Sequence, residues 1–208
     1  MAVTDRLVIG IVVGSTRSHR RGDSVAGWLV EICSFFDAEF VLLDLADFAL
    51  PHLDEPEPAR RRYRPAQAHT ARWAAAVGAC DGFVVITPEY NHSFPGVLKN
   101  ALDYLHSEWE DKAVGFVSYG GYGGVRAVEH LRSVCGQLKM ADVRAQPALS
   151  LAVDFDEEGR CDPSDLQIRF CHDMLDEVIS WASALKALRT RVFRPPDGRG
   201  GVVVPGVQ

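Results

Sequence analysis

Cysteine is scarce and unpaired in this sequence. The 208 residues include five cysteines, and no two of them form a Cys-x-x-Cys pair. A disulfide framework and a zinc site both need paired or closely spaced cysteines, so neither is expected. The cysteines are Cys33, Cys80, Cys135, Cys161 and Cys171. An odd number of scattered thiols is typical of a reducing compartment, and we expect the protein to be cytoplasmic.

Long apolar runs and an excess of positive charge are also absent. The longest apolar runs span about seven residues, far short of the roughly 20 that cross a bilayer. The amino-terminal residues are too polar for a secretory signal. With 22 Lys and Arg against 28 Asp and Glu, the net charge is −6, which disfavours nucleic acid or an anionic membrane as the general partner.

Apolar segments with the length of strands recur along the chain. Residues 7–13 (LVIGIVV) form an unbroken run rich in β-branched residues, which is typical of a strand buried on both faces of a parallel sheet. Further strands are predicted at residues 40–43, 83–86 and 113–117. A fifth is predicted near residues 143–153, and its Pro147 suits a sheet edge because proline cannot donate to a strand ladder.

Amphipathic helices are predicted between these strands from the spacing of apolar residues. The inward-facing residues are predicted to be Val25, Leu29, Ile32, Cys33 and Phe36 in the first helix; Trp73 and Val77 in the second, which starts at Pro65; Leu98, Ala101, Leu102 and Leu105 in the third, which starts at Pro95; Val128, Leu131, Cys135 and Leu138 in the fourth; and Phe170, Met174, Val178 and Leu185 in the last. Residues 44–65 are predicted to be a loop. Residues 1–193 are predicted to form one domain, followed by a flexible tail at 194–208.

Strands that alternate with helices predict an α/β fold with a doubly wound, five-stranded parallel sheet in three layers. Right-handed crossovers favour the strand order 2-1-3-4-5. Ligands of such sheets bind beyond the carboxyl ends of the strands, beside the point where the strand order reverses. We therefore expect the site in the loops that follow the first, third and fourth strands.

The first of these loops, residues 14–24, joins a buried strand to the start of a helix, where unpaired N–H groups and the helix dipole favour an anion. Its side chains that can bind an anion are Ser15, Thr16, Arg17, Ser18, His19, Arg20, Arg21 and Ser24. Neither Gly-x-x-x-x-Gly-Lys-Ser/Thr nor Gly-x-Gly-x-x-Gly follows the strand. The loop is therefore predicted to hold a phosphate monoester without magnesium, and the alternative is a solvated polar loop.

The second loop, residues 87–96, contains two prolines, two aromatic residues and Asn91. A stiff loop with apolar rings, and an amide that both donates and accepts, suits a planar heteroaromatic ligand. Glu89 and His92 are candidates for acid–base or metal-binding roles, but neither has a partner at a suitable spacing. For Glu89 we favour backbone contacts, and for His92 a surface position.

The third loop, residues 118–124, has glycine at four of its last five positions. Glycine permits positive φ angles and a close approach of the backbone to a ligand. A Gly-x-Ser-x-Gly nucleophile elbow is not formed, because Gly115 lies one residue too far from Ser118. A tight turn is the alternative interpretation.

Three blocks of residues together resemble the flavodoxin-like NAD(P)H-dependent FMN reductases, a family that includes chromate-, quinone- and azo-reducing members. The blocks are GSTR at residues 14–17, PEYN at 88–91 with PGVLKNALD at 95–103, and GGYGGVRA at 120–127. The similarity extends over roughly residues 7–150, and its most specific part is the block from 88 to 103.

The resemblance implies FMN as the cofactor, NADPH or NADH as the hydride donor, and a small acceptor such as a quinone, free flavin, azo compound or metal oxyanion. The implied FMN contacts are Gly14, Ser15, Arg17, Gly22, Asp23, Ser24, Pro88, Glu89, Tyr90, Asn91, Ser118, Tyr119, Gly120 and Gly121. Ser15, Arg17 and backbone amides would hold the phosphate, and the other two loops would border the ring. No catalytic side chain and no metal are implied, because flavin itself performs the hydride chemistry. A homodimer or a dimer of dimers is implied, with the helix after Pro95 at the interface.

The main alternative is a flavodoxin-type electron carrier or a regulatory FMN-binding protein, which would share the fold and the cofactor. Such carriers tend to have threonine-rich phosphate loops, whereas this loop contains arginine. An iron–sulfur flavoprotein is disfavoured because the cysteines lack compact spacing. The basic run at residues 60–64 is interpreted as a solvated loop or a subunit contact rather than a site for the 2′-phosphate of NADPH.

Overall fold

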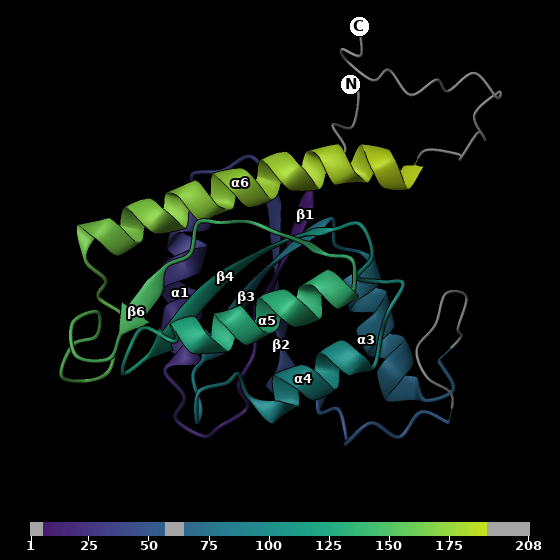
Figure 1. Cartoon of the computed structure of the whole chain (residues 1–208), viewed down its shortest axis with the longest axis horizontal. Coiled ribbons are helices and arrows are strands. Elements are labelled where there is room, and N and C mark those ends of the chain that lie inside the picture. Colours follow the sequence, from purple (N-terminus) through teal and green to yellow (C-terminus); the bar gives the residue numbers. More distant parts are fainter. Residues whose placement is uncertain (1–5, 57–64, 191–208) are drawn as a thin grey trace, which may run out of the picture.

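Six parallel strands form one sheet in the computed structural model, which describes residues 6–56 and 65–190 (Figure 1). The strands are β1 (Val8–Val13), β2 (Glu39–Asp44), β3 (Gly82–Pro88), β4 (Ala113–Gly120), β5 (Ala141–Asp142) and β6 (Ala148–Ser150). Their order is β2-β1-β3-β4-β5, and β6 also pairs with β4. The predicted parallel sheet and its order are therefore confirmed.

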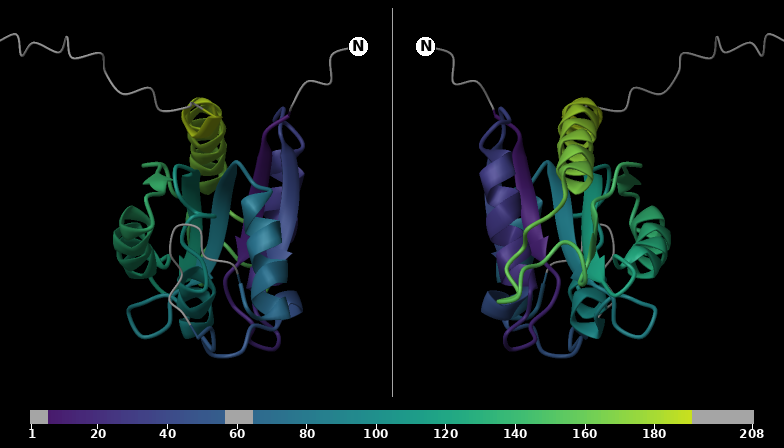
Figure 2. Two further views of the ribbon diagram at one scale, coloured as in Figure 1. Left: turned by 90° about the vertical axis from the view of Figure 1, so that its right-hand side faces the viewer. Right: turned by 90° about the vertical axis from the view of Figure 1, so that its left-hand side faces the viewer.

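Helices cover both faces of this sheet, as the three-layer prediction requires. One face carries α1 (Gly22–Cys33) and α6 (Asp165–Thr190); the other carries α3 (Ala68–Gly78), α4 (Gly96–Asp103) and α5 (Val125–Gln137); the short α2 (Leu45–Phe48) follows β2. The yellow end of α6 and the purple start of β1 lie at the same end of the molecule (Figure 2). Among the described residues, no helix is both long and apolar enough to cross a membrane.

Aromatic rings dominate the core beneath α3, α4 and α5. Trp73, Phe83 and Trp109 are fully buried. The ring of Trp109 meets the rings of Trp73 and Phe83 edge to face, with centroid separations of 5.8 and 4.9 Å. The indole N–H of Trp73 also donates to the carbonyl of Ala101 at 2.8 Å, so this ring satisfies its one polar group while it fills the core.

Helix α6 is fixed to the other face by close packing and by an ion pair at its end. A Cβ on Gly115 of β4 would come within 2.8 Å of the side chains of Met174 and Val178, so glycine lets α6 approach the strand. Near the end of α6, Arg189 pairs with Asp81 at 2.6 Å. The helix is thereby held along its length.

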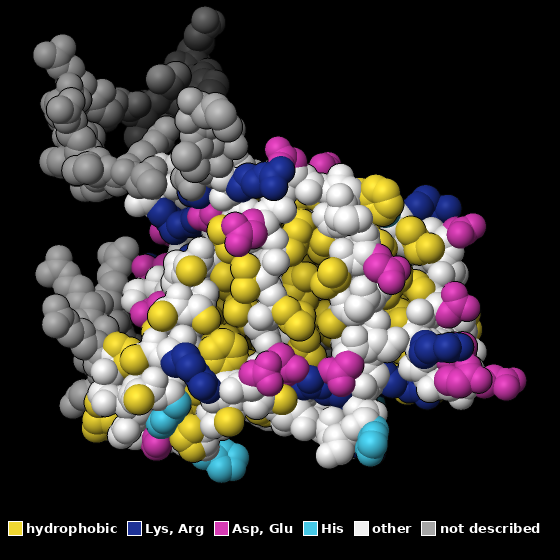
Figure 3. Space-filling model, turned by 180° about the vertical axis from the view of Figure 1, so that it is seen from behind, with side chains coloured by type: hydrophobic (Ala, Val, Ile, Leu, Met, Phe, Trp, Pro, Cys, Tyr) yellow, Lys and Arg dark blue, Asp and Glu magenta, His cyan; other side chains and the backbone are white. Residues whose placement is uncertain are grey.

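The strand β2 forms one open edge of the sheet. Leu42 at the middle of this strand is 53% exposed, whereas Leu43 beside it is buried. Seen from behind, the surface shows apolar side chains across the middle of this side of the molecule (Figure 3).

The predicted fifth strand, residues 143–153, is wrong as one continuous element. The structure has two short strands instead, β5 before this range and β6 within it, and residues 151–153 form a turn. Pro147 lies between the two strands, where its carbonyl accepts a hydrogen bond from the N–H of Ser118 at 3.0 Å. Because both short strands pair only with β4, the predicted edge position is confirmed.

Three further predictions about helices need correction. Phe170 is 39% exposed rather than inward-facing, because the buried stripe of α6 runs through Cys171, Met174 and Leu175. The second long helix begins at Ala68 rather than at Pro65, and a short helix, α2, lies in the segment predicted as a loop. The remaining inward-facing residues are buried or pack against the core as predicted. The basic run at 60–64 and the tail at 194–208 lie outside the described residues.

The packing of Trp73 predicts the result of a matched pair of substitutions. Trp73→Ala removes a fully buried ring and its hydrogen bond, so we expect the free energy of unfolding to fall by about 3–5 kcal/mol. Trp181→Ala removes a ring that is 48% exposed, and we expect a loss below about 1 kcal/mol. Urea unfolding followed by circular dichroism measures both. Equal losses would contradict the assignment of Trp73 to the core.

Candidate functional site

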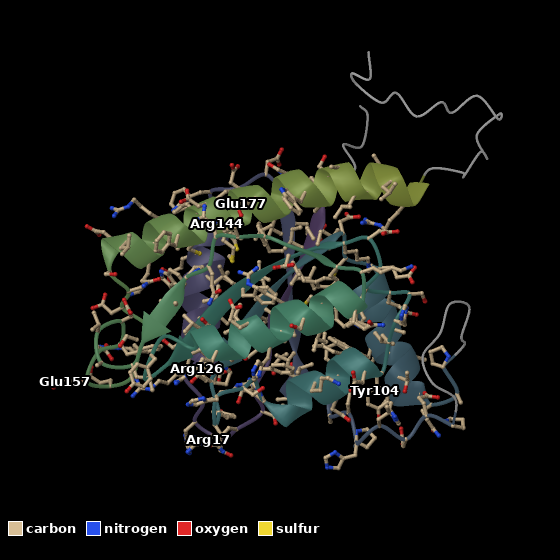
Figure 4. All side chains as sticks on the ribbon, in the orientation of Figure 1. Arg17, Tyr104, Arg126, Arg144, Glu157 and Glu177 are labelled. Atoms are coloured by element: carbon tan, nitrogen blue, oxygen red, sulfur yellow. The ribbon has the colours of Figure 1, made fainter. Side chains whose placement is uncertain are left out.

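The loops that follow β1, β3 and β4 line one cleft of about 410 Å³ at the carboxyl ends of the strands. Its lining residues are Arg17, Ser18, His19, Arg20, Arg21, Pro88, Glu89, Tyr90, Tyr119, Gly120 and Leu151. The side chains of Arg17, from the first loop, and Arg126, from α5, lie at the same end of the molecule (Figure 4). The three loops identified from the sequence thus contribute to one cleft.

Backbone N–H groups of the first loop are available to an anion. Within the described part of the chain, the N–H groups of Thr16, Ser18 and His19 donate no hydrogen bond, and those of Asp23 and Ser24, in the first turn of α1, have no acceptor. Ser15 is buried, and its hydroxyl lies 3.0 Å from the hydroxyl of Tyr90, which joins the first loop to the second. The start of α1 therefore has the free donors of an anion site.

Arg20 is the internal brace of this loop. Its guanidinium binds both carboxylate oxygens of Asp44, at the end of β2, and Asp23 at 2.7 Å. It also donates to the carbonyl of Ser15. Hydrogen bonds to Asp44 raise the pKa of Arg20 above its already high ordinary value. Because its donors are occupied by these partners, Arg20 is not the group that would meet a ligand anion.

Arg17 is an unpaired cation at the same cleft. Its side chain is exposed and lines the cleft, and it forms no ion pair or hydrogen bond with any residue in the ranges 6–56 and 65–190. The sequence could not distinguish the arginines of this loop. The structure does so through Asp44, which lies far from Arg20 in the sequence and close to it in space.

Two buried polar atoms at the cleft have no hydrogen-bond partner among the described residues: the hydroxyl of Tyr119 and Nη1 of Arg21. Tyr119 is only 5% exposed, and its hydroxyl lies 3.1 Å from where a Cβ on Gly22 would be, at the first residue of α1. Burial raises the pKa of Tyr119, so the hydroxyl stays protonated and can donate. Buried donors without acceptors at a helix start fit an anionic group such as a phosphate.

The second loop presents a fixed backbone to the cleft. Tyr90 and Ser93 exchange two backbone hydrogen bonds, at 2.8 and 3.1 Å, which close a tight turn. Asn91 and His92 within this turn have φ angles of 50° and 69°. The N–H of Glu89 donates to the carbonyl of Tyr119 at 3.0 Å, so the second and third loops are joined directly.

The carboxylate of Glu89 holds the start of α5. It accepts hydrogen bonds from the backbone N–H of Arg126 at 3.2 Å and from its Nε at 2.6 Å. Burial opposes ionisation of Glu89, but the hydrogen bonds and charge of Arg126 outweigh it and lower the pKa of the carboxyl. Arg126 also lies 3.0 Å from His92 and stacks on the ring of Tyr122. The predicted backbone contact of Glu89 is present, and its side chain has a bracing role that the sequence did not reveal.

The glycines of the third loop fall into two groups. Gly123 and Gly124 have positive φ angles, and a Cβ on Gly124 would come within 2.9 Å of the Cβ of Ser118, so these two shape the turn. Gly120 lines the cleft, and a Cβ on Gly121 would meet nothing within 4 Å. The hydroxyl of Ser118 donates to the carbonyl of Gly123 at 2.6 Å, within the turn.

Six of the predicted contact residues line the cleft: Arg17, Pro88, Glu89, Tyr90, Tyr119 and Gly120. The others are outside its lining and stay predictions: Gly14, Ser15, Gly22, Asp23, Ser24, Asn91, Ser118 and Gly121. Leu151 also lines the cleft but was not predicted as a site residue, because it reaches the cleft only through the turn after β6. Its N–H donates to the carbonyl of Gly120 at 3.1 Å, a long-range contact without a sequence signal.

A second hollow, of about 580 Å³, lies between α5 and α6 and includes Arg144 and Glu177, both labelled in Figure 4. Here two side chains of α6 reach the segment at the outer edge of the sheet. Glu177 accepts a hydrogen bond from the N–H of Ala145 at 3.2 Å, and Gln167 accepts one from Ala148 at 2.9 Å. Because these side chains occupy the backbone N–H groups at the sheet edge, another strand cannot pair there. We assign this hollow no ligand.

Comparisons with known proteins point to one family. Residues 7–154 match the family described as NADPH-dependent FMN reductase. The NAD(P)H-dependent FMN reductase C4B3.06c of Schizosaccharomyces pombe is 39% identical over 168 residues, which is 79% of this chain and 82% of that protein. The 2-hydroxy-1,4-benzoquinone reductase of a Burkholderia species is 29% identical over 84% of this chain and 96% of its own length.

Solved structures agree in fold. The flavoenzyme FerB of Paracoccus denitrificans, described as an NAD(P)H:(acceptor) oxidoreductase, superposes with a TM-score of 0.66 at 19% identity. The superposition covers 86% of this chain and 98% of that one. The predicted flavodoxin-like architecture is therefore confirmed.

The contrast between the two arginines predicts different effects on stability. Arg20→Ala leaves the carboxylate of Asp44 without its partner, so we expect the free energy of unfolding to fall by about 1–3 kcal/mol. Arg17→Ala removes the same charge from the same loop but breaks no contact, and we expect a change within about 0.5 kcal/mol. Urea titrations of both apoproteins measure this. A larger loss for Arg17→Ala than for Arg20→Ala would contradict these roles.

Proposed function

Since the chain belongs to the NADPH-dependent FMN reductase family, we propose that its cleft binds FMN, with the phosphate at the start of α1 and the ring along the loops after β3 and β4. The protein is an oxidoreductase that uses FMN and NAD(P)H. The observation that carries this placement is the chemical difference between the two sides of the cleft. Hydrogen-bond donors without acceptors lie around the first loop, where they suit the phosphate. The backbone of the second and third loops, fixed by hydrogen bonds, lies on the other side, where it suits the ring.

At the phosphate, each group of the first loop has a separate task. The N–H groups of the loop and of the first turn of α1 donate to the phosphate oxygens, and Arg17 supplies the charge that a phosphate dianion requires. The buried hydroxyl of Tyr119 adds a further donor. Arg20 keeps the loop in the shape that turns these donors toward the cleft.

At the ring, the second and third loops bind mainly through their backbones. Pro88 and Gly120 line the cleft from adjacent strands, β3 and β4, and the bond between the N–H of Glu89 and the carbonyl of Tyr119 fixes their separation. Bound FMN supplies the hydride transfer, and the chain binds it, orients it and excludes water. No side chain of the cleft is assigned as a general acid or base.

For the electron acceptor we propose a small, planar and largely apolar molecule such as a quinone. Exposed apolar side chains extend from the two loops beside Gly120: Tyr122 is 77% exposed, Val153 is 69% exposed, and Leu151 is 41% exposed. An aromatic side chain stacks on a flat ring, and aliphatic side chains pack against its apolar face. The names of the relatives, among them a quinone reductase of Pseudomonas putida and an NAD(P)H:quinone oxidoreductase of potato, support the same class.

We also propose a cytoplasmic homodimer, or a dimer of such dimers, with the outer side of α4 in the interface. The exposed Val125, which begins α5 and lines the second hollow, would gain cover from a second copy. The free thiols of all five cysteines support a reducing compartment. Light scattering on the purified protein tests the assembly, and a monomeric mass would contradict it.

The placement of the phosphate predicts how Arg17→Ala changes ligand affinity. We expect FMN binding to weaken by about 1.5–3 kcal/mol, because a charged hydrogen bond is lost. Binding of riboflavin, which lacks the phosphate, should change little. Quenching of flavin fluorescence measures both constants. Arg6→Ala, at the opposite end of the strands, is the control and should leave both unchanged. An equal loss for FMN and riboflavin, or no loss, would show that the phosphate lies elsewhere.

The proposed acceptor predicts a role for Tyr122 in quinone reduction. Tyr122→Ala should raise KM for a benzoquinone by up to about tenfold, because one aromatic contact is removed. Reduction of the bound cofactor by NADPH, followed in a stopped-flow instrument, should keep its rate. Phe35→Ala is a matched control, since Phe35 is also 77% exposed but lies just beyond the far end of α1. An unchanged KM for Tyr122→Ala would argue against an acceptor at this rim.

A further inference from the structure

Arg21 immediately precedes α1. It takes no part in the ion pairs of Arg20, and unlike the exposed Arg17 it is partly buried. It lines the cleft, and its Nη1 atom is buried without a hydrogen-bond partner among the described residues. Its guanidinium lies 5.0 Å from the centroid of the Phe155 ring. A buried guanidinium nitrogen without an acceptor is unfavourable, so this arrangement is incomplete unless an anion is present.

The partner of Arg21 in this contact is a structured loop, residues 151–164, which follows β6. The buried carboxylate of Asp154 closes the loop by accepting hydrogen bonds from the N–H groups of Ser150 at 2.7 Å and Ser164 at 3.1 Å. Phe155 and Cys161 pair across it as an isolated antiparallel bridge. These bonds hold the loop together as one structural unit. Its first residue, Leu151, lines the cleft.

Two contacts join this loop to the start of α1. The hydroxyl of Ser24 accepts a hydrogen bond from the N–H of Cys161 at 2.6 Å. The guanidinium of Arg21 packs against Phe155 and over Gly159, where a Cβ would come within 3.0 Å of Nη1. Gly159 also has a φ of +82°, so both the close approach of Arg21 and the backbone conformation favour glycine at this position. Arg21 thus lies between the loop and the site at which an anion would bind.

We propose that Arg21 is a positioning residue that contacts the phosphate of bound FMN and, through its stacking on Phe155, fixes the 151–164 loop against the cleft. This inference rests on the placement of FMN given under Proposed function. A planar guanidinium can stack on a ring with one face and donate from its edge to a phosphate at the same time, which an ammonium group cannot do. Occupancy of the phosphate site would therefore be transmitted to Leu151, at the wall of the cleft.

Hydrogen exchange of the wild-type protein tests the coupling without any substitution. Amide exchange across residues 151–164 is measured by mass spectrometry in the apoprotein, with saturating FMN and with saturating riboflavin. We expect FMN to slow exchange in this loop and riboflavin to leave it near the apoprotein rate, because only FMN carries the phosphate. Equal protection by the two ligands would contradict the proposal.

Substitutions separate the phosphate contact from simple packing. For Arg21→Ala we expect about a tenfold loss of FMN affinity, less than about a twofold change for riboflavin, and no FMN-dependent protection of the loop. Arg21→Lys keeps the charge but not the planar fork, so it should recover part of the FMN affinity and none of the protection. Arg6→Ala is the matched control: its side chain is 63% exposed, pairs with Asp37 and lies outside both the loop and the cleft, so all three readouts should match the wild type.

The outcomes distinguish this inference from the function on which it rests. If the wild type binds FMN no more tightly than riboflavin, the placement of the phosphate is wrong and both fail. If the wild type prefers FMN and Arg21→Ala keeps the same preference, only the role of Arg21 is wrong. If Arg21→Ala weakens both flavins equally, its role is packing alone, and the proposal is overturned.

Discussion

The ion pair between Arg20 and Asp44 is the constraint on which the cleft depends. It joins the loop after β1 to the end of β2, and the same guanidinium holds Asp23 and the carbonyl of Ser15. With the side chains of Arg20 and Asp44 only 8% and 16% exposed, little water competes for these bonds. A polar loop rich in basic residues is thereby given one shape, and in that shape its N–H groups stay free for a ligand.

A second brace keeps the other side of the cleft at a fixed distance. The buried carboxylate of Glu89 binds Arg126 at the start of α5, while the N–H of Glu89 binds the carbonyl of Tyr119. One residue of the second loop thus holds both the third loop and the helix that follows it. Arg20 and Glu89 were candidate functional residues in the sequence. In the structure, both use their charge to hold neighbouring segments together rather than to bind the ligand. The chemistry is left to the cofactor, and the chain contributes shape and fixed dipoles.

Much of this arrangement was predictable from the sequence because it depends on local patterns. Apolar runs such as residues 7–13 and helical stripes such as that of Leu98 and Leu102 led to the correct sheet order and to the three loops. Partners distant in sequence were not predictable. No local signal shows that Arg20 rather than Arg17 meets Asp44, or that Leu151 reaches the cleft through a turn. Phe170 was misassigned because its spacing from Met174 fits the buried stripe of α6, whereas in the folded protein Cys171 takes the buried position one turn before Met174.

The most direct test of the account is an anaerobic absorbance titration of the FMN-loaded protein with NADPH. The account predicts rapid bleaching of the visible flavin bands at one equivalent of NADPH, and full recovery of the bands when a quinone is added. Bound FMN that stays oxidised for minutes in excess NADPH would contradict it. That result would point instead to a protein that holds the cofactor for a protein partner.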